Sequence, residues 1–131
     1  SLAAGVRPLT NMVPLLALKD EQPWFAVGAS GGRRIMPCVF QIAQLIAGHG
    51  LDLGAAMAHP RFDMSELDHI TVDSRLPAAA RAALAGVAPL KEVQTVAFPN
   101  RFASPQAVMR DGDGVIGAAH IDGPLNGVAA R

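Results

Sequence analysis

The first third of the chain alternates between apolar and polar blocks, each of the length of a strand or a turn. Val13 to Lys19 is an apolar run rich in leucine, and Trp24 to Ala29 is a second one. Between them, Asp20-Glu21-Gln22-Pro23 has the residues of a turn. Two apolar runs joined by a short polar turn predict a β-hairpin.

A helical period begins at Ile35. Positions 0, +4, +7 and +11 of this segment are apolar and share one face of a helix: Ile35, Val39, Ile42 and Ile46. Four further apolar residues widen the expected face: Met36, Phe40, Ala43 and Ala47. Pro37 falls in the first turn, where proline is tolerated, and Gly48 ends the helix. A second, short helix is expected over Leu53 to Ala58, capped by Asp52 and stopped by His59-Pro60.

The second half alternates again between strand and helix patterns. It predicts a strand, a helix and another strand at His69 to Asp73, Pro77 to Leu84 and Glu92 to Phe98. Gln106 to Arg110 and Val115 to His120 flank Asp111-Gly112-Asp113-Gly114, a strong hairpin signal. The expected fold is therefore α+β, with mainly antiparallel strands and two or three helices. No stretch rich in Pro, Gly or Ser divides residues 1–131, so we expect one domain.

Composition narrows the function classes. Half of the 131 residues are apolar and 17% are charged, which favours a buried core over disorder. Eleven basic and eleven acidic residues give no net charge, so nothing points to nucleic acid or an anionic membrane. The longest apolar stretch, Ile35 to Gly48, is too short to span a bilayer. Cys38 is the only cysteine, which excludes an intrachain disulfide and favours a small core residue over a reactive thiol.

Two segments carry candidate chemistry. Gly31-Gly32 lies between a predicted strand and a predicted helix, where main-chain N–H groups are open to a ligand oxygen. Such a turn can stabilise an oxyanion in acyl transfer or hold a phosphate, but the residues alone favour a plain tight turn over an anion site. The residues around it match neither the Walker pattern nor the dinucleotide fingerprint. Thr10 and Asn11 precede the first strand and either cap it or offer a hydroxyl and an amide to a carboxylate.

Taken together, these segments resemble the small subunit of γ-glutamyltransferases. That family has a serine-serine-methionine-serine-proline motif, a strand hairpin, and a glycine-glycine-serine-arginine-isoleucine motif that opens a helix. Here Thr10-Asn11-Met12-Val13-Pro14 and Gly31-Gly32-Arg33-Arg34-Ile35 stand in that order and at that spacing. Gly50 to Phe62 is similar to the segment in which a short helix ends in Pro-Arg-Phe, and Gly112 to Asp122 to the last strands. The resemblance covers nearly the whole chain.

The resemblance implies an N-terminal-nucleophile hydrolase with a four-layer αββα sandwich, made by self-cleavage of a precursor. It implies that a threonine upstream of this region attacks a γ-glutamyl amide, so the nucleophile is not in this chain and Ser1 does not replace it. Gly31 and Gly32 would be the oxyanion donors, and Thr10 and Asn11 would hold the substrate's carboxylate. The chain would then be a truncated C-terminal region, inactive alone, whose partner is the remainder of its precursor. The resemblance also suggests a periplasmic or extracellular location.

Three departures from the family pattern bear on the substrate. Asn11 and Val13 each replace a serine, and Ser30 replaces a proline before the glycines. These three replacements leave the oxyanion role of Gly31 and Gly32 intact. They are also compatible with a related acylase that cleaves an amide other than a γ-glutamyl one. A non-catalytic module that keeps the fold and binds a small carboxylate is the alternative function. Should the sandwich be incomplete, its exposed apolar strand surface would need a partner, either the rest of the precursor or a second copy.

The remaining polar residues give weaker signals. The spacing of His49, His59, His69 and His120 fits no metal motif, which favours surface or core roles, and we expect no metal or cofactor. Asp111 and Asp113 hint at a calcium loop, but a hairpin turn explains them better. Arg33 and Arg34 either face a ligand carboxylate or serve the structure. Arg34 is favoured for the structural role, because it matches the family's arginine.

Overall fold

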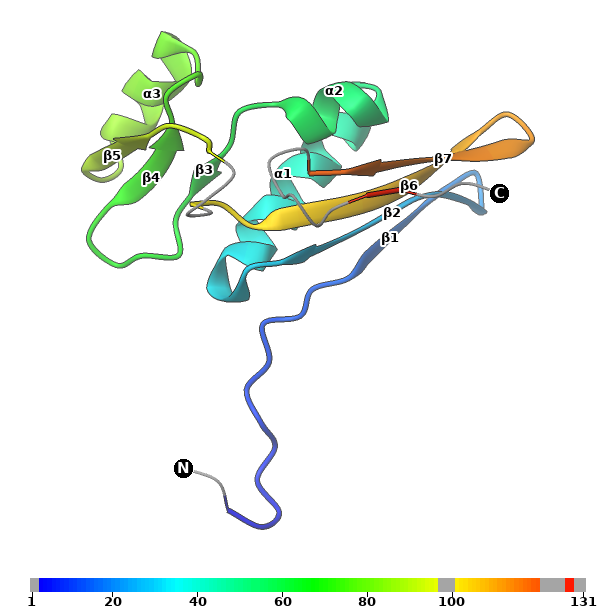
Figure 1. The fold of residues 1–131 in the computed structure, drawn as a ribbon, viewed down its shortest axis with the longest axis horizontal. Coiled ribbons are helices and arrows are strands. Elements are labelled where there is room, and N and C mark those ends of the chain that lie inside the picture. The colour runs from blue at the N-terminus through cyan, green and yellow to red at the C-terminus, as the bar shows by residue number, and fades with distance from the viewer. Residues whose placement is uncertain (1–2, 97–100, 121–126, 129–131) are drawn as a thin grey trace.

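The computed structural model of this chain describes residues 3–96, 101–120 and 127–128. Within them the strands form two sheets (Figure 1). Sheet A has four strands in the order β1-β2-β6-β7, with bounds Leu15–Lys19, Gln22–Ser30, Ser104–Asp111 and Gly114–Ala119. Sheet B has three strands in the order β3-β4-β5, with bounds Phe62–Asp63, Ile70–Asp73 and Leu90–Val93. The predicted α+β class is confirmed, and the strand pairs are antiparallel except β4–β5.

Both predicted hairpins form. The turn between β1 and β2 consists of Asp20 and Glu21, whose φ angles are 51° and 62°. Two positive φ angles in a two-residue turn match the right-handed twist of the flanking strands. The β6–β7 hairpin turns at Gly112, whose φ is 57°. The sequence therefore predicted both turns correctly, although it placed Gln22 and Pro23 in the first turn and the structure has them at the start of β2.

Helix α1 (Ile35–Ala47) confirms the predicted helical period, and its four predicted face residues are buried: Ile35, Val39, Ile42 and Ile46. The expectation that Met36, Phe40 and Ala47 widen that face was wrong, because all three are exposed, Met36 and Phe40 by 56% and 61%. At 100° per residue they lie roughly 90° to 130° around the helix from the centre of the buried stripe. One sheet face covers only a narrow stripe of a helix, so these three side chains face outward.

Helix α2 (Leu53–Ala58) begins and ends as the sequence predicts. The Asp52 carboxylate accepts a hydrogen bond from the Ala55 N–H at 2.7 Å, which satisfies one donor of the first turn. His59 leaves the helical conformation just before Pro60. Together α1 and α2 cover one face of sheet A (Figure 1).

Sheet B differs most from expectation. Helix α3 (Ala78–Ala85) connects β4 to a parallel neighbour, so β4, α3 and β5 form a crossover unit. The strand predicted at Glu92 to Phe98 lies at Leu90–Val93, and positions 97 and 98 fall outside the described residues. β3 was not predicted, because two residues carry no readable period. A small core of Ile70, Val72 and Leu76 holds this sheet to α3.

The other face of sheet A has no helix on it in the described part of the chain. Four large apolar side chains lie on this open face, with exposed fractions of 47% to 65%: Leu16, Leu18, Val108 and Val115. Val128 lies over Gly117 there, since a Cβ added to Gly117 would come within 2.5 Å of the Val128 Cγ1. No helix in the described ranges has the length and apolar character needed to cross a membrane.

Candidate active-site turn and arm

The Gly31-Gly32 turn lies where β2 ends and helix begins. Gly31 has a φ of +148°, and a Cβ added to it would meet the Cα and Cβ of Ala103 at 2.9 Å. Gly32 has a φ of +63°, with open space where a Cβ would be. Both angles disfavour other residues, and the approach of Ala103 to Gly31 excludes a side chain there. The backbone of this turn is therefore fixed by packing and accessible at Gly32.

The turn presents main-chain donors beside two arginines. A 3-10 turn (Gly32–Arg34) leads directly into α1, so the N–H groups of Gly31 and Gly32 have no intrahelical acceptor. The Gly31 carbonyl accepts from the Arg34 N–H at 3.3 Å and from Arg34 Nε at 3.4 Å. Arg34 is half-buried and Arg33 is exposed. Arg34 thus braces the turn, as the sequence favoured, while the Arg33 charge faces solvent.

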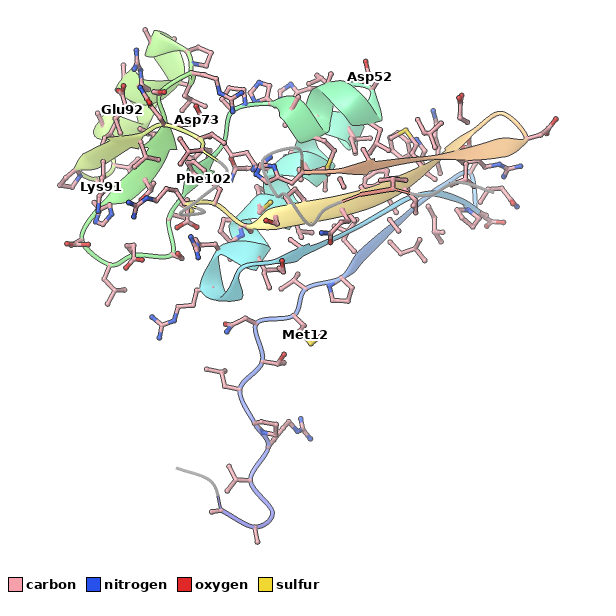
Figure 2. The ribbon with its side chains drawn as sticks, viewed as in Figure 1. Met12, Asp52, Asp73, Lys91, Glu92 and Phe102 are labelled. Carbon is pink, nitrogen blue, oxygen red and sulfur yellow. The ribbon has the colours of Figure 1, made fainter. Side chains whose placement is uncertain are left out.

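Thr10 and Asn11 lie on an extended arm, residues 3–14, that precedes β1. β1 pairs antiparallel with β2, with Leu15 opposite Val27, so the arm leaves sheet A at the end where β2 runs into Gly31. Figure 1 shows the arm projecting away from the sheet, and Thr10 and Asn11 are exposed. Met12, labelled on this arm in Figure 2, is 78% exposed and donates its N–H to Thr10 Oγ1 at 3.2 Å. The structure therefore places both motifs at one end of the sheet without packing them together.

The four histidines lie in different surroundings, although His59 and His120 line the same small cavity. His49 is exposed, His69 pairs with Asp68 at 2.7 Å, and His59 Nδ1 lies 2.8 Å from the Pro60 carbonyl. His120 is buried. Among the residues with described positions, no three His, Cys, Asp or Glu side chains form a group able to hold a metal ion.

Asp111 and Asp113 flank the β6–β7 hairpin turn and are exposed. Cys38 is buried, and burial raises the pKa of its thiol, an effect that the nearby Arg61 only partly offsets. The thiol is therefore protonated near neutral pH, as expected for a core residue.

A buried polar network behind the turn was not predicted from the sequence. Asp73 at the end of β4 is 1% exposed and accepts from Arg75 Nη2 at 2.6 Å and Thr95 Oγ1 at 2.5 Å. Burial raises the pKa of this carboxyl, but the hydrogen bonds from Arg75 and Thr95 outweigh burial and lower the pKa to about 2. Figure 2 shows Asp73 and Phe102 between the two sheets. The Asp73 N–H donates to the Arg61 carbonyl at 3.0 Å, and Arg61 Nη2 lies 3.2 Å from Nδ1 of His120, a residue 59 positions along the chain.

Comparison with known proteins identifies what this arrangement resembles. Residues 1–127 match the sequence model of the family described as Gamma-glutamyltranspeptidase. The chain is 30% identical over 109 residues to a glutathione hydrolase proenzyme of Escherichia coli (strain K12), covering 82% of this chain and 18% of that protein. It is 33% identical over 84 residues to an acylase ACY 1 proenzyme of Pseudomonas sp. (strain SE83), covering 64% and 15%. The chain thus spans less than a fifth of either proenzyme.

The fold is similar as well. The solved gamma-glutamyltranspeptidase of Pseudomonas nitroreducens, complexed with L-DON, superposes with a TM-score of 0.77 at 24% identity. The match covers all of this chain and 68% of that one. The two chains therefore share the N-terminal-nucleophile hydrolase fold over the full length of this chain.

Proposed function

The chain belongs to the gamma-glutamyltranspeptidase family, and from that premise we propose that it forms the oxyanion wall of an amide-cleaving enzyme. In the proposed reaction a threonine elsewhere in the precursor attacks a γ-glutamyl or related amide and forms an acyl-enzyme. The acyl group then passes to water or an amino acid. The N–H groups of Gly31 and Gly32 would bind the oxyanion of the tetrahedral intermediate.

One observation carries the proposal most directly. Gly31 is held against Ala103 at a distance that leaves no room for a side chain. Its neighbour Gly32 is open to solvent, with space where a side chain would be. A backbone fixed by packing suits oxyanion stabilisation, because main-chain donors held in place need no reorganisation as charge develops. A turn that served only to reverse the chain would not need both features.

Thr10 and Asn11 are proposed to hold the carboxylate of the acyl donor. The support is their position at the same end of sheet A as the Gly31-Gly32 turn. The Thr10 hydroxyl and the Asn11 amide both donate hydrogen bonds, and hydrogen bonds to a charged group are the stronger kind. In this arrangement the arm folds over the turn when the rest of the site is present.

The rest of the precursor is the proposed partner, and it would cover the open face of sheet A. Leu16, Leu18, Val108 and Val115 lie on that face, and two sheets packed about 10 Å apart would bury them. A second copy of the chain is the alternative occupant. Light scattering of the chain alone and with the upstream part of its precursor distinguishes a self-paired dimer from a one-to-one complex.

The experiment measures turnover of a γ-glutamyl anilide. We expect none from the 131-residue chain alone and measurable turnover from the processed full-length protein. Gly31→Ala in the full-length protein keeps the main-chain N–H but should displace it, because the added Cβ meets Ala103. We therefore expect kcat to fall by about 10²-fold or more, as when one oxyanion donor is out of place. Turnover by this chain alone that survives substitution of both glycines would refute the proposal.

The non-catalytic alternative is a module that binds a small carboxylate. It is favoured if the parent gene encodes no threonine at a self-cleavage junction upstream of this region. The acylase relative supports including other amides in the assay, so a glutaryl anilide should be tested beside the γ-glutamyl one.

A further inference from the structure

The buried contact between Arg61 and His120 joins parts of the chain that are far apart in sequence. Arg61 follows α2 and is 5% exposed, and His120 follows β7 and is 4% exposed. Arg61 Nη2 lies 3.2 Å from His120 Nδ1, and Arg61 Nη1 donates to the Met57 carbonyl at 3.2 Å. Within the described residues no carboxylate pairs with Arg61, and its Nε has no hydrogen-bond partner. The imidazole is thus one of few acceptors that this buried cation has.

The geometry fixes the protonation state of His120. A guanidinium group only donates hydrogen bonds, so His120 Nδ1 must accept, and the ring is neutral with its proton on Nε2. Protonation at Nδ1 would replace the accepting lone pair with a second donor. It would also place two positive charges 3.2 Å apart. The cavity beside them is about 10 Å³, room for roughly one water, so solvent could not screen that repulsion.

The contact is linked to the Gly31-Gly32 turn through residues 102–105. The His120 N–H donates to the Pro105 carbonyl at 2.9 Å. Phe102 lines the same cavity as Arg61 and His120. Its neighbour Ala103 packs against Gly31, and Ser104 pairs with Ser30 at the end of β2. One short stretch therefore contacts the buried pair on one side and the turn on the other.

We propose that Arg61 and His120 are positioning residues that hold residues 102–105 against Gly31, and that His120 releases this support when it takes up a proton. The importance of the turn itself rests on the proposed function. The pH dependence of the contact between residues 102–105 and Gly31 does not rest on the proposed function. A site built this way keeps its oxyanion donors fixed at neutral and alkaline pH and loosens them as the solution becomes mildly acidic.

The other charged groups facing the cavity do not behave in the same way. They are His59, Asp73 and Arg75 in the described part of the chain. His59 Nδ1 faces the Pro60 carbonyl, so it already donates, and protonation at Nε2 would keep that bond. Asp73 has a pKa of about 2 and stays ionised beside Arg75 above pH 4. Between pH 5 and 8, where histidines ordinarily titrate, His120 is the group that would lose its contact.

The test follows the amide signals of Gly31 and Gly32 by NMR from pH 8 to pH 5 in the 131-residue chain. We expect both signals to shift with the same midpoint as the His120 ring. Below about pH 6.5, the ordinary histidine pKa that applies to the released state, the ratio of held to released turn should fall about tenfold per pH unit until the held ring itself takes up a proton. His120→Asn keeps an acceptor near the position of Nδ1 but does not titrate. The chemical shifts of the Gly31 and Gly32 amides should then stay constant with pH. His59→Asn, from the same cavity, should leave the shift in place.

Three outcomes would overturn the inference. The first is glycine signals that do not move, and the second is signals that move equally in His120→Asn. The third is an Nδ1-protonated His120 ring at pH 8, read from its ¹⁵N shifts in the wild-type chain. That last measurement needs no variant, so it stays decisive if His120→Asn does not fold. None of these readouts uses turnover, so failure here leaves the proposed function to its own assay.

Discussion

The Gly31-Gly32 turn and the arm that carries Thr10 and Asn11 lie at the same end of sheet A, but they are held differently. Ala103 and Arg34 contact the turn from two sides. Along residues 3–12 of the arm the side chains are exposed, and Thr10 Oγ1 accepts a hydrogen bond only from the neighbouring Met12 N–H in the described structure. The turn is therefore formed by this chain alone, whereas the arm needs another surface to define its position.

The difference has an energetic meaning. A rigid donor pair loses no entropy when it binds an oxyanion, so its full interaction is available to the transition state. Ordering the arm costs about 1–2 kcal/mol of backbone entropy per residue. The contacts made by residues 10–14 would therefore have to offset several kcal/mol of lost backbone entropy before they stabilised the bound state. We expect the proposed carboxylate-binding residues Thr10 and Asn11 to contribute to substrate affinity only after the rest of the protein has fixed the arm.

The largest effect on stability is expected from a substitution that disrupts the Gly31-Gly32 turn. Gly31→Ala should lower the free energy of unfolding by about 2–4 kcal/mol, because its Cβ meets the Ala103 backbone and its φ suits only glycine. Urea unfolding monitored by the single tryptophan, Trp24, measures the loss. Gly5→Ala is the matched control on the arm, where φ is +78° and a Cβ meets nothing. Its cost should stay below about 0.5 kcal/mol, as expected for an unpacked segment. Equal costs would remove the contrast between turn and arm.

The next effect tests the network behind the turn. Asp73→Asn should cost about 1–3 kcal/mol at pH 7, because it weakens bonds to Arg75 and Thr95 in a buried site. The folded-state pKa of Asp73 is lowered to about 2. Its stabilisation is therefore complete above the unfolded value of about 3.9 and is lost as pH falls toward 2. Urea unfolding at pH 7, 4 and 2.5 should show wild type and variant converging. Asp68→Asn, at an exposed carboxyl, should have little effect on stability at pH 7.

A smaller effect separates the two arginines. Arg34→Ala should cost about 1 kcal/mol, since it removes the side-chain donor to the Gly31 carbonyl. Arg33→Ala should change stability by less than about 0.5 kcal/mol, because the side chain is exposed. Thermal unfolding of the two variants side by side measures the difference. A larger loss for Arg33→Ala would contradict the assignment of Arg34 as the structural arginine.

The smallest effect on stability is expected on the arm. Thr10→Ala and Asn11→Ala should each leave the free energy of unfolding of this chain within about 0.5 kcal/mol. In the processed full-length protein the same changes should raise KM for a γ-glutamyl anilide by about tenfold or more, the cost of a hydrogen bond to a charged group. An unchanged KM would argue against a carboxylate role for the arm.

Sequence patterns predicted the elements that local chemistry specifies. The apolar stripe of α1, the Asp52 cap and both hairpin turns follow from short-range spacing, and each is present. The position of β5 was wrong because its register with β4, in which Ile70 faces Leu90, depends on a partner 20 residues away. The Arg61–His120 contact was missed for the same reason. Each residue alone reads as ordinary, and only the fold brings them to 3.2 Å.

The open face of sheet A also determines how this chain behaves in a test tube. Its formal net charge at pH 7 is zero, so copies of the chain do not repel one another at long range. Leu16, Leu18, Val108 and Val115 then give those copies an apolar surface to share. Colloidal stability should therefore be lowest near neutral pH. Alkaline buffer restores a repulsive charge, and it is the condition in which dilute, monodisperse solutions of the chain should be prepared.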